Sequence, residues 1–250
     1  MVARLVWDQN VAGSSPVIPI KDLLNASLFF YMIEAIEKIG LWIPSLLSGA
    51  KLTVLLTLAS VSVGLLISVF LALGKISKNK IVNKICAFYI FFFRGTPLLL
   101  QLYFVYYGLP KINPAFTITS RFFAAFVTFA LNSSAYLAEV VRAAIVSIDK
   151  GQLEASRSLG MNYGQTMFSV VIPQALARLL PPVGNEFILV LKDASLVSII
   201  ALSDITRVTQ NIASSTSSSL VYIPAMILYL IITAFFTWTF NKLEKKFTAE

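Results

Sequence analysis

Hydrophobic and polar positions alternate along this chain on the scale of whole segments rather than single residues. Long apolar runs are separated by short polar stretches, and a run of about 20 apolar residues is long enough for a helix to cross a bilayer. Five runs qualify, and they lie approximately at Leu52–Leu73, Ile85–Leu109, Phe122–Val146, Thr166–Leu202 and Leu220–Phe240. The pattern therefore predicts an all-α integral membrane protein with five transmembrane helices.

Two of these runs have a composition that predicts how they pack. The first is rich in Ser, Thr and Gly, and small residues let helix backbones approach closely where lipid gives no hydrophobic drive between helices. The fourth is interrupted by Pro and Gly, which free backbone groups that other helices or polar cavities must satisfy. We therefore expect the fourth run to be broken or kinked and buried, because it contains Pro173, Pro181, Pro182 and Gly184.

Basic residues in the connecting segments predict the orientation of the chain, since Lys and Arg favour the cytoplasmic side. They cluster in the segments after the first, third and fifth runs, at Lys75, Lys78, Lys80, Lys84, Arg142, Lys150, Arg157, Lys242, Lys245 and Lys246. The opposite segments carry only Lys111, Arg121 and Arg207. The C-terminus is thus expected in the cytoplasm and the segment before the first run outside, in a multi-pass protein of the inner (plasma) membrane.

Composition excludes several other classes of protein. The chain is 57% hydrophobic and only 13% charged, whereas soluble domains carry roughly 25% charged residues. The net charge of +8 does not indicate nucleic-acid binding, because the Lys residues stand at the ends of apolar segments and form no basic face. The sequence holds no His and a single Cys, Cys86, so neither an internal disulfide nor a His-based metal site is expected. It also lacks a phosphate-binding loop and a catalytic constellation, which argues against an enzyme.

The N-terminal residues differ from the rest of the chain. Residues 1–31 include a stretch, Met1–Ile20, without amphipathic period or signal-peptide pattern. Two interpretations remain open, a flexible tail and a tRNA 3′ arm translated by mistake, with Met32 as the true start. Residues 32–47 combine apolar and charged positions and suggest a short amphipathic helix on the outer surface.

One polar segment, residues 147–168, carries a motif. It contains Glu154-Ala155-Ser156 and then Gly160, and Ile172-Pro173 follows in the next apolar run. This order resembles the signature loop of the permease subunits of ABC importers, which has Glu-Ala-Ala, a Gly four residues past the last Ala, and a Leu-Pro after a fixed gap. Ser156 and Ile172 depart from that pattern by small changes.

Further motifs resemble the polar amino-acid branch of the same family. They are Arg94-Gly95-Thr96-Pro97-Leu98-Leu99, the pattern Asn-x-x-Ala-Tyr-x-x-Glu-x-x-Arg from Asn132 to Arg142, and Lys192-Asp193-x-Ser-Leu. The resemblance covers about Ser48 to the C-terminus. It implies the type I ABC importer (MetI-like) fold, with a transmembrane domain over 48–242 and a cytoplasmic tail over 243–250.

The resemblance also implies partners. Two permease subunits, identical or different, would form a solute pathway between them, a separate pair of ATPase subunits would bind ATP and Mg, and an external binding protein would deliver the amino acid. This chain would then need no cofactor of its own. The alternative is a stand-alone secondary transporter or channel for small polar solutes, although the sequence lacks the internal repeat that many such transporters carry.

The loop 147–168 would contact the ATPase. Gly160 can adopt a positive φ and so end one short helix before another begins. Around it, apolar groups including Leu159 and Phe168 suit insertion into a groove of a partner. The other interpretation is an ordinary cytoplasmic connection. The residues expected to couple to the ATPase are Gly151, Leu153, Glu154, Ala155, Ser156, Arg157, Gly160, Met161 and Tyr163.

Polar residues inside the apolar runs are candidates for the solute pathway, because ionisable groups at membrane depth are costly and usually functional. They are Arg94, Gln101, Asn132, Tyr136, Glu139, Asn185, Glu186, Lys192 and Asp193.

Structural roles remain open for several of these residues. Arg94 could instead snorkel to the interface or cap carbonyls freed by Pro97. Glu139 could pair with Arg142 three residues later. Asn132 and Tyr136 could join helices. Lys192 and Asp193 point about 100° apart on a helix and cannot pair well, so both could lie solvated at a helix break near the outer mouth. The sequence does not identify the amino acid, since acidic residues suit a cationic solute and Arg94 or Lys192 suit its carboxylate.

Overall fold

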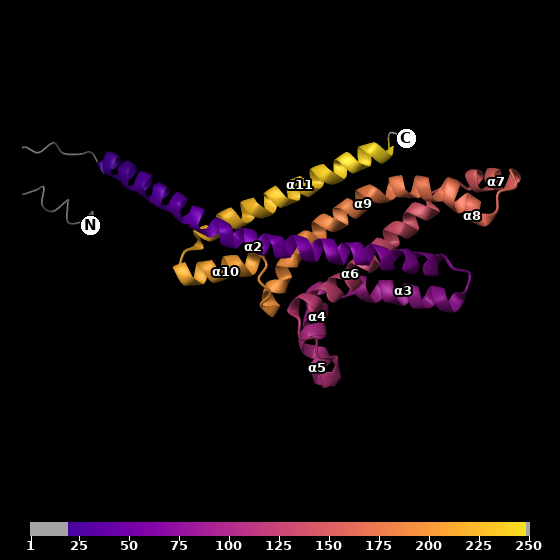
Figure 1. Ribbon diagram of the computed structural model, residues 1–250, viewed down its shortest axis with the longest axis horizontal. Helices are drawn as coiled ribbons and strands as arrows, with labels where there is room; N and C mark the ends of the chain where they lie inside the picture. Colours follow the sequence, from indigo (N-terminus) through magenta and orange to yellow (C-terminus); the bar gives the residue numbers. More distant parts are fainter. Residues whose placement is uncertain (1–19, 249–250) are drawn as a thin grey trace, which may run out of the picture. The chain divides into compact units, whose positions relative to one another are not determined.

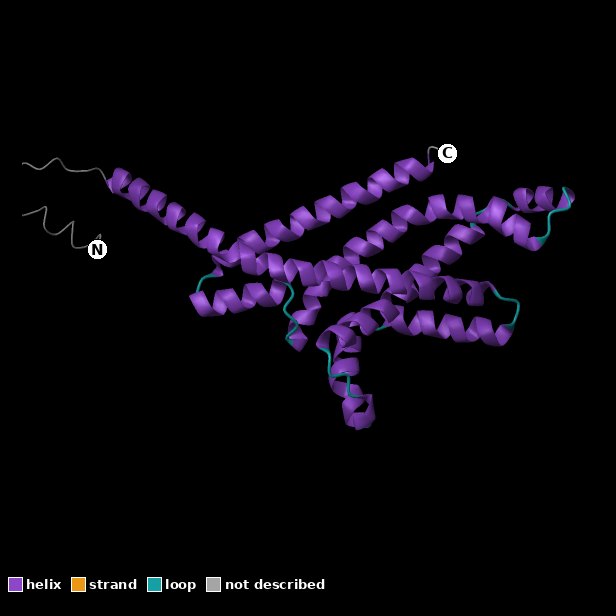
Figure 2. Ribbon diagram, viewed as in Figure 1, coloured by secondary structure: helices purple, strands orange, loops and turns teal. Residues whose placement is uncertain are grey.

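The computed structural model describes the backbone of residues 20–248 and the side chains of residues 38–246. The described chain is helical, without a strand (Figure 2). It divides into two units, residues 1–43 and residues 44–250, and the description below concerns the second. The α-helices are α2 Ile20–Ile76, α3 Lys80–Gly95, α4 Leu98–Tyr103, α5 Leu109–Ile112, α6 Arg121–Val146, α7 Lys150–Ser158, α8 Tyr163–Thr166, α9 Ile172–Asp193, α10 Ile205–Thr216 and α11 Tyr222–Thr248.

The remaining elements are π- or 3₁₀-helical: η1 Phe104–Gly108, η2 Pro114–Phe116, η3 Met167–Val171, η4 Ala194–Ile200 and η5 Ser219–Val221. Both π segments, η1 and η3, precede a proline by two residues, Pro110 and Pro173. A proline in a helix lacks the N–H and its ring clashes with the carbonyl four residues earlier. A wider π turn at that point is a common accommodation inside helices.

The first apolar run lies on α2, which begins at Ile20 and continues without interruption to Ile76. Residues 32–47, expected as a separate amphipathic helix, are therefore continuous with this helix, and Pro44 lies inside it. The expected location of 32–47 on the outer surface stays a prediction. Of the expected N-terminal extension, residues 20–31 are helical and residues 1–19 lie outside the described residues.

The second run differs from the single helix that its hydropathy suggests. It forms α3 and then α4 to α5, and the two parts meet at an angle of 102°. Thr96 has the extended backbone angles φ −116° and ψ 143°, as expected for a residue before proline. Together with Pro97 it ends α3 and starts α4.

Three described helices are long and apolar enough to cross a membrane, Lys38–Ile76, Arg121–Val146 and Ser219–Lys246, or four if the bent pair counts as one crossing. The third run is thus confirmed as a helix. α9 is not among them, and it carries several charged and amide side chains. The number of five crossings stays a prediction.

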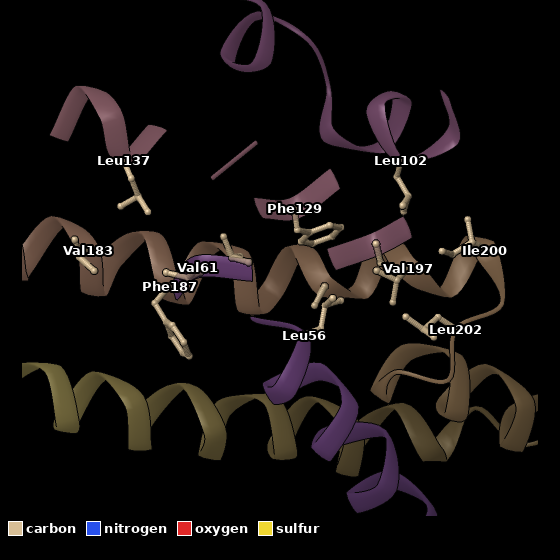
Figure 3. Close-up of a cluster of buried hydrophobic side chains, with 13 residues drawn as sticks. Leu56, Val61, Leu102, Phe129, Leu137, Val183, Phe187, Val197, Ile200 and Leu202 are labelled. Atoms are coloured by element: carbon tan, nitrogen blue, oxygen red, sulfur yellow. The ribbon is translucent and has the colours of Figure 1, made fainter. Parts of the chain in front are cut away.

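The fourth run was expected to be broken or kinked; no break occurs within α9, and a kink stays a prediction. α9 continues through Pro181 and Pro182, and the irregular turns lie at its ends, in η3 and η4. The helix packs against α6 and α11. A cluster of buried apolar side chains surrounds it, including Leu56 of α2, Phe129 of α6 and Phe187 of α9 (Figure 3).

The small residues of α2 allow close packing, as the sequence predicts. Thr53, Thr57, Ser60 and Ser68 are buried. A Cβ added at Gly64 would lie 3.1 Å from the carbonyl oxygen of Ala130, a backbone atom of α6. Within this unit the α2–α3 turn lies at the same end as α7 and α8 (Figure 1). The basic α2–α3 turn and the loop 147–168 thus share one side.

Candidate solute cavity and coupling loop

A cavity of about 600 Å³ lies where the bent α3–α4 pair meets α6 and α9. Several of the polar residues predicted for the solute pathway line it, from three different apolar runs. These are Arg94, Asn132, Tyr136, Glu186 and Asp193. The structure thereby brings together residues that are up to about 100 positions apart in sequence.

The backbone groups freed by the bend are satisfied by two amide side chains. The Gln101 amide nitrogen donates to the carbonyl oxygens of Phe93 at 3.0 Å and Thr96 at 3.1 Å. The Asn132 amide donates to the Phe93 carbonyl at 3.1 Å and to the Gln101 side-chain oxygen at 3.0 Å. Gln101 is buried and does not line the cavity. The carbonyl-capping role considered for Arg94 is therefore performed at these two carbonyls by Gln101 and Asn132.

The charged residues of the cavity make no ion pair with one another in the part of the chain that the structure describes. The Arg94 guanidinium lies over the Tyr136 ring, 5.3 Å from its centroid. The Glu186 side chain is buried, and the hydroxyl of Ser133 in α6 is buried without a hydrogen bond of normal geometry. Charged groups that line a cavity and make no ion pair with one another can bind a polar solute.

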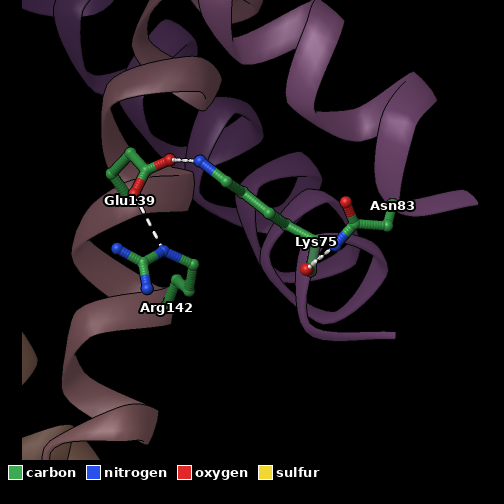
Figure 4. Close-up of polar contacts among 4 residues, drawn as sticks. All are labelled: Lys75, Asn83, Glu139 and Arg142. Carbon is green, nitrogen blue, oxygen red and sulfur yellow. Dashed lines mark hydrogen bonds and ion pairs between the residues drawn. The ribbon is translucent and has the colours of Figure 1, made fainter. Parts of the chain in front are cut away.

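Glu139 lies outside this cavity, in an ion-pair cluster that we call the inner cluster: Lys75, Glu139 and Arg142 (Figure 4). Arg142 Nε lies 2.9 Å from Glu139 Oε2, which confirms the predicted pairing. Lys75 of α2 pairs with the other carboxylate oxygen, and the Asn83 amide donates to the Lys75 carbonyl. Sequence reasoning missed Lys75 as the partner, because the pairing joins residues 64 positions apart.

The inner cluster borders a second cavity, of about 330 Å³, that Lys75, Phe91 and Glu139 line. Arg94 and Gly95 line this cavity and the larger one. The two cavities therefore adjoin at the end of α3.

Two other predicted pathway residues face elsewhere. Asn185 lines a different cavity, against Phe240 of α11, because neighbouring positions on a helix point about 100° apart and Glu186 occupies the inward direction. Lys192 is exposed and makes no ion pair with Asp193 among the described residues, as their spacing predicts.

The loop between α6 and α9 is built from short, well-capped helices. Asp149 caps α7 by accepting a hydrogen bond from the Gly151 N–H at 2.6 Å. Gly160 has φ +76°, which confirms the predicted positive φ, and the Met161 N–H closes the turn on the Ser156 carbonyl at 3.0 Å. Asn162 and Gln165 then form a capping box that starts α8.

Apolar side chains project from this loop, as the sequence predicts. Leu159 is 82% exposed, Tyr163 77% and Phe168 74%. Met161 and Met167 are less exposed and face a cavity of about 260 Å³ inside the loop, which Leu153, Arg157 and Tyr163 also line. Of the remaining predicted coupling residues, Gly151, Glu154 and Ala155 are exposed, whereas Ser156 is buried.

Comparison with known proteins gives the class to which this architecture belongs. Residues 64–249 match the family described as the inner membrane component of binding-protein-dependent transport systems, and the chain belongs to that family. Its members are transport subunits of the membrane rather than enzymes.

Individual relatives agree with this assignment. The chain is 39% identical over 213 residues to the L-cystine transport system permease protein TcyL of Bacillus subtilis, covering 83% of this chain and 89% of the relative. It is 36% identical over 211 residues to the glutamine transport system permease protein GlnP of Escherichia coli, covering 82% and 93%.

Solved structures support the fold. A chain from the crystal structure of an amino acid ABC transporter with histidines has a TM-score of 0.77 and 38% identity, covering 87% of this chain and 98% of that one. A chain of the MetNI methionine ABC transporter has a TM-score of 0.68 at 18% identity, and this likeness concerns the fold alone. The predicted type I importer fold is thus confirmed.

Proposed function

We propose that this protein is the permease subunit of an ATP-driven ABC importer for polar amino acids. The observation that carries the proposal is the cavity of about 600 Å³, whose unpaired charges have both signs, Arg94 against Glu186 and Asp193. A free amino acid carries both a carboxylate and an ammonium group. A cavity with separated charges of both signs suits such a zwitterion better than it suits an inorganic ion or an apolar molecule.

The solute contacts that we propose are the residues lining this cavity, Arg94, Asn132, Tyr136, Glu186 and Asp193. Gln101 lies outside the cavity lining and stabilises the bend between α3 and α4 through its hydrogen bonds to the Phe93 and Thr96 carbonyls. Glu139, Asn185 and Lys192, which the sequence also suggested, lie outside the cavity and receive no direct solute contact in this proposal.

A second copy of the chain, or a sister permease, would complete the pathway, and an external binding protein would deliver the amino acid. ATP and Mg would be bound by a separate pair of ATPase subunits. The protein would lie in the inner membrane, with the loop 147–168 and the C-terminus in the cytoplasm. The alternation of basic segments supports this orientation.

The same loop would dock into the ATPase. Leu159, Tyr163 and Phe168 project from it and are largely exposed, and the rim carries Glu154 and Arg157. Short amphipathic helices with exposed apolar anchors typically bind in the groove of a partner. The positive φ of Gly160 sets the direction of the chain between α7 and α8.

Gly160→Val tests the docking role. A Cβ at this position would meet nothing within 4 Å, so the cost of the substitution lies in the backbone and not in a clash. A β-branched residue at φ +76° loses roughly 1–2 kcal/mol or changes the turn. We expect Gly160→Val to reduce co-purification with the ATPase and solute uptake. Gly160→Asn, which tolerates left-handed angles, should retain both, and full activity of the Val variant would contradict the docking role.

Reconstitution tests the function itself. Liposomes containing the permease, the ATPase and the binding protein should take up a polar amino acid only with internal ATP. Uptake by the permease alone, driven by a solute or ion gradient, would instead identify a secondary transporter or channel.

A further inference from the structure

The coupling loop is tied to the inner end of α9 by side-chain hydrogen bonds that the sequence motifs do not include. The Gln174 amide nitrogen donates to the side-chain oxygen of Gln152 in α7 at 2.5 Å. The Arg178 guanidinium donates to the Ser147 carbonyl at 2.5 Å and to the Ser147 hydroxyl at 2.6 Å. Gln174 and Arg178 are four residues apart, so they project from one face of α9.

The Arg178 contact is well placed electrostatically. Ser147 directly follows the last residue of α6, where carbonyl groups lack intrahelical partners and the helix dipole is negative. A guanidinium at this point satisfies a free carbonyl and complements the dipole. Arg178 thus joins three parts, the end of α6, the start of the loop and α9.

The loop itself is stiffened where this chain departs from the family pattern. Ser156 stands at the third position of the Glu-Ala-Ala motif, and its buried hydroxyl accepts a hydrogen bond from the Thr166 hydroxyl at 3.2 Å. This bond links α7 to α8 across the turn at Gly160. These hydrogen bonds therefore restrict movement of α7 and α8 relative to α9.

We propose that Gln174 and Arg178 form a brace that makes the coupling loop and α9 move as one body. A displacement of α7 would then reach Glu186 and Asp193, the cavity residues that α9 carries. Gln174 and Arg178 act through the helix and are positioning residues. The inference rests on the proposed docking of α7 to an ATPase and adds the route by which the movement reaches the solute.

A cross-link tests whether α7 and α9 move together or relative to each other. In a Cys86→Ala background, Gln152→Cys and Gln174→Cys are joined by a short bis-methanethiosulfonate linker, and ATP-driven import is measured in liposomes with the ATPase and binding protein. If the two elements move together, the cross-linked protein imports at least as well as its reduced form, which lacks the Gln152–Gln174 bond, and within about threefold of the Cys86→Ala background. A larger loss that reduction reverses would show that α7 must move relative to α9 and would overturn the brace.

Removing the brace gives the complementary test. The variants Gln174→Leu and Arg178→Gln, alone and combined, should keep ATPase association and ATP hydrolysis. The amount of solute imported per ATP should fall by about fivefold or more in the combined variant. The matched control is Ser158→Ala, which removes an exposed hydrogen bond that stays within α7 and should leave the ratio unchanged.

The other outcomes overturn one hypothesis or the other. An unchanged ratio in the brace variants, or a parallel loss of association, hydrolysis and import, would contradict the brace. Import by the wild-type permease without any ATPase would instead refute the proposed function.

Discussion

Two groups of charged residues in this protein use similar chemistry in opposite ways. In the inner cluster, Glu139 is held between Lys75 and Arg142, and its carboxylate oxygens each face a cation. In the cavity, Arg94 faces the ring of Tyr136, while Glu186 and Asp193 make no ion pair in the described part of the chain. The charges of the first group are paired with one another, whereas those of the second form no ion pair among the described residues.

This difference separates a structural role from a functional one. Removing the cations from a partly buried carboxylate destabilises the folded protein. The inner cluster therefore holds α2 and α6 together through the ion pair between Lys75 and Glu139. Charges without partners in a membrane protein usually face a polar cavity or a solute. We therefore expect substitutions in the inner cluster to change stability and substitutions in the cavity to change transport.

The largest effect is expected for Glu139→Gln. It leaves Lys75 and Arg142 facing each other without the carboxylate between them. The Glu139 side chain is 18% exposed, so we expect a loss of about 2 kcal/mol, below the ~3–5 kcal/mol of a fully buried pair. The measurement is thermal unfolding of the purified protein in detergent, together with its yield.

The control for this variant is Glu154→Gln, which changes an exposed carboxylate of the coupling loop without an ion pair among the described residues. Its unfolding temperature should equal that of the wild type. Equal unfolding temperatures of the two variants would show that the inner cluster does not stabilise the fold.

A loss of transport without a loss of stability is expected for Glu186→Gln and Asp193→Asn. Neither removes an internal ion pair, so unfolding and ATPase association should be unchanged or slightly improved. Import should fall by about tenfold, which corresponds to 1.4 kcal/mol of lost solute interaction. Poor assembly of these variants would assign the cavity charges a structural role, and normal import would remove them from the solute site.

The smallest effect is expected for Asn185→Ala. Asn185 is the sequence neighbour of Glu186 but faces α11. The exposed amide contributes little to stability, so both import and unfolding should stay close to wild type. A transport defect as large as that of Glu186→Gln would mean that the solute passes along the α9–α11 side.

Much of the comparison could be anticipated from sequence because its components are local. The helix over the third run, the positive φ of Gly160 and the pairing of Glu139 with Arg142 each depend on residues within a few positions of one another. The facing of Asn185 away from Glu186 follows from helix geometry alone.

The rest depends on contacts between distant segments. The bend at Thr96 and Pro97 requires the Gln101 and Asn132 amides to donate hydrogen bonds to its free carbonyls, and no local pattern shows that these residues meet. Hydropathy alone predicts a straight helix there. The pairing of Lys75 with Glu139 likewise requires the packing of α2 on α6. Continuity of α9 through Pro181 and Pro182 was also missed, because neighbouring helices can compensate for the backbone groups that proline frees.

The π turn of η3, Met167–Val171, fixes the rotational phase between the coupling loop and everything beyond it. A π turn contains one more residue than an α turn, and one residue corresponds to about 100° of helix rotation. Deleting a single residue there would keep the hydrophobicity and the spacing from Glu154 to Gly160, yet would turn Gln174 and Arg178 away from Gln152 and Ser147. The length of this segment therefore determines the orientation of α9 relative to the loop as much as its residues do. An insertion or deletion of one residue should be tolerated less well than most substitutions.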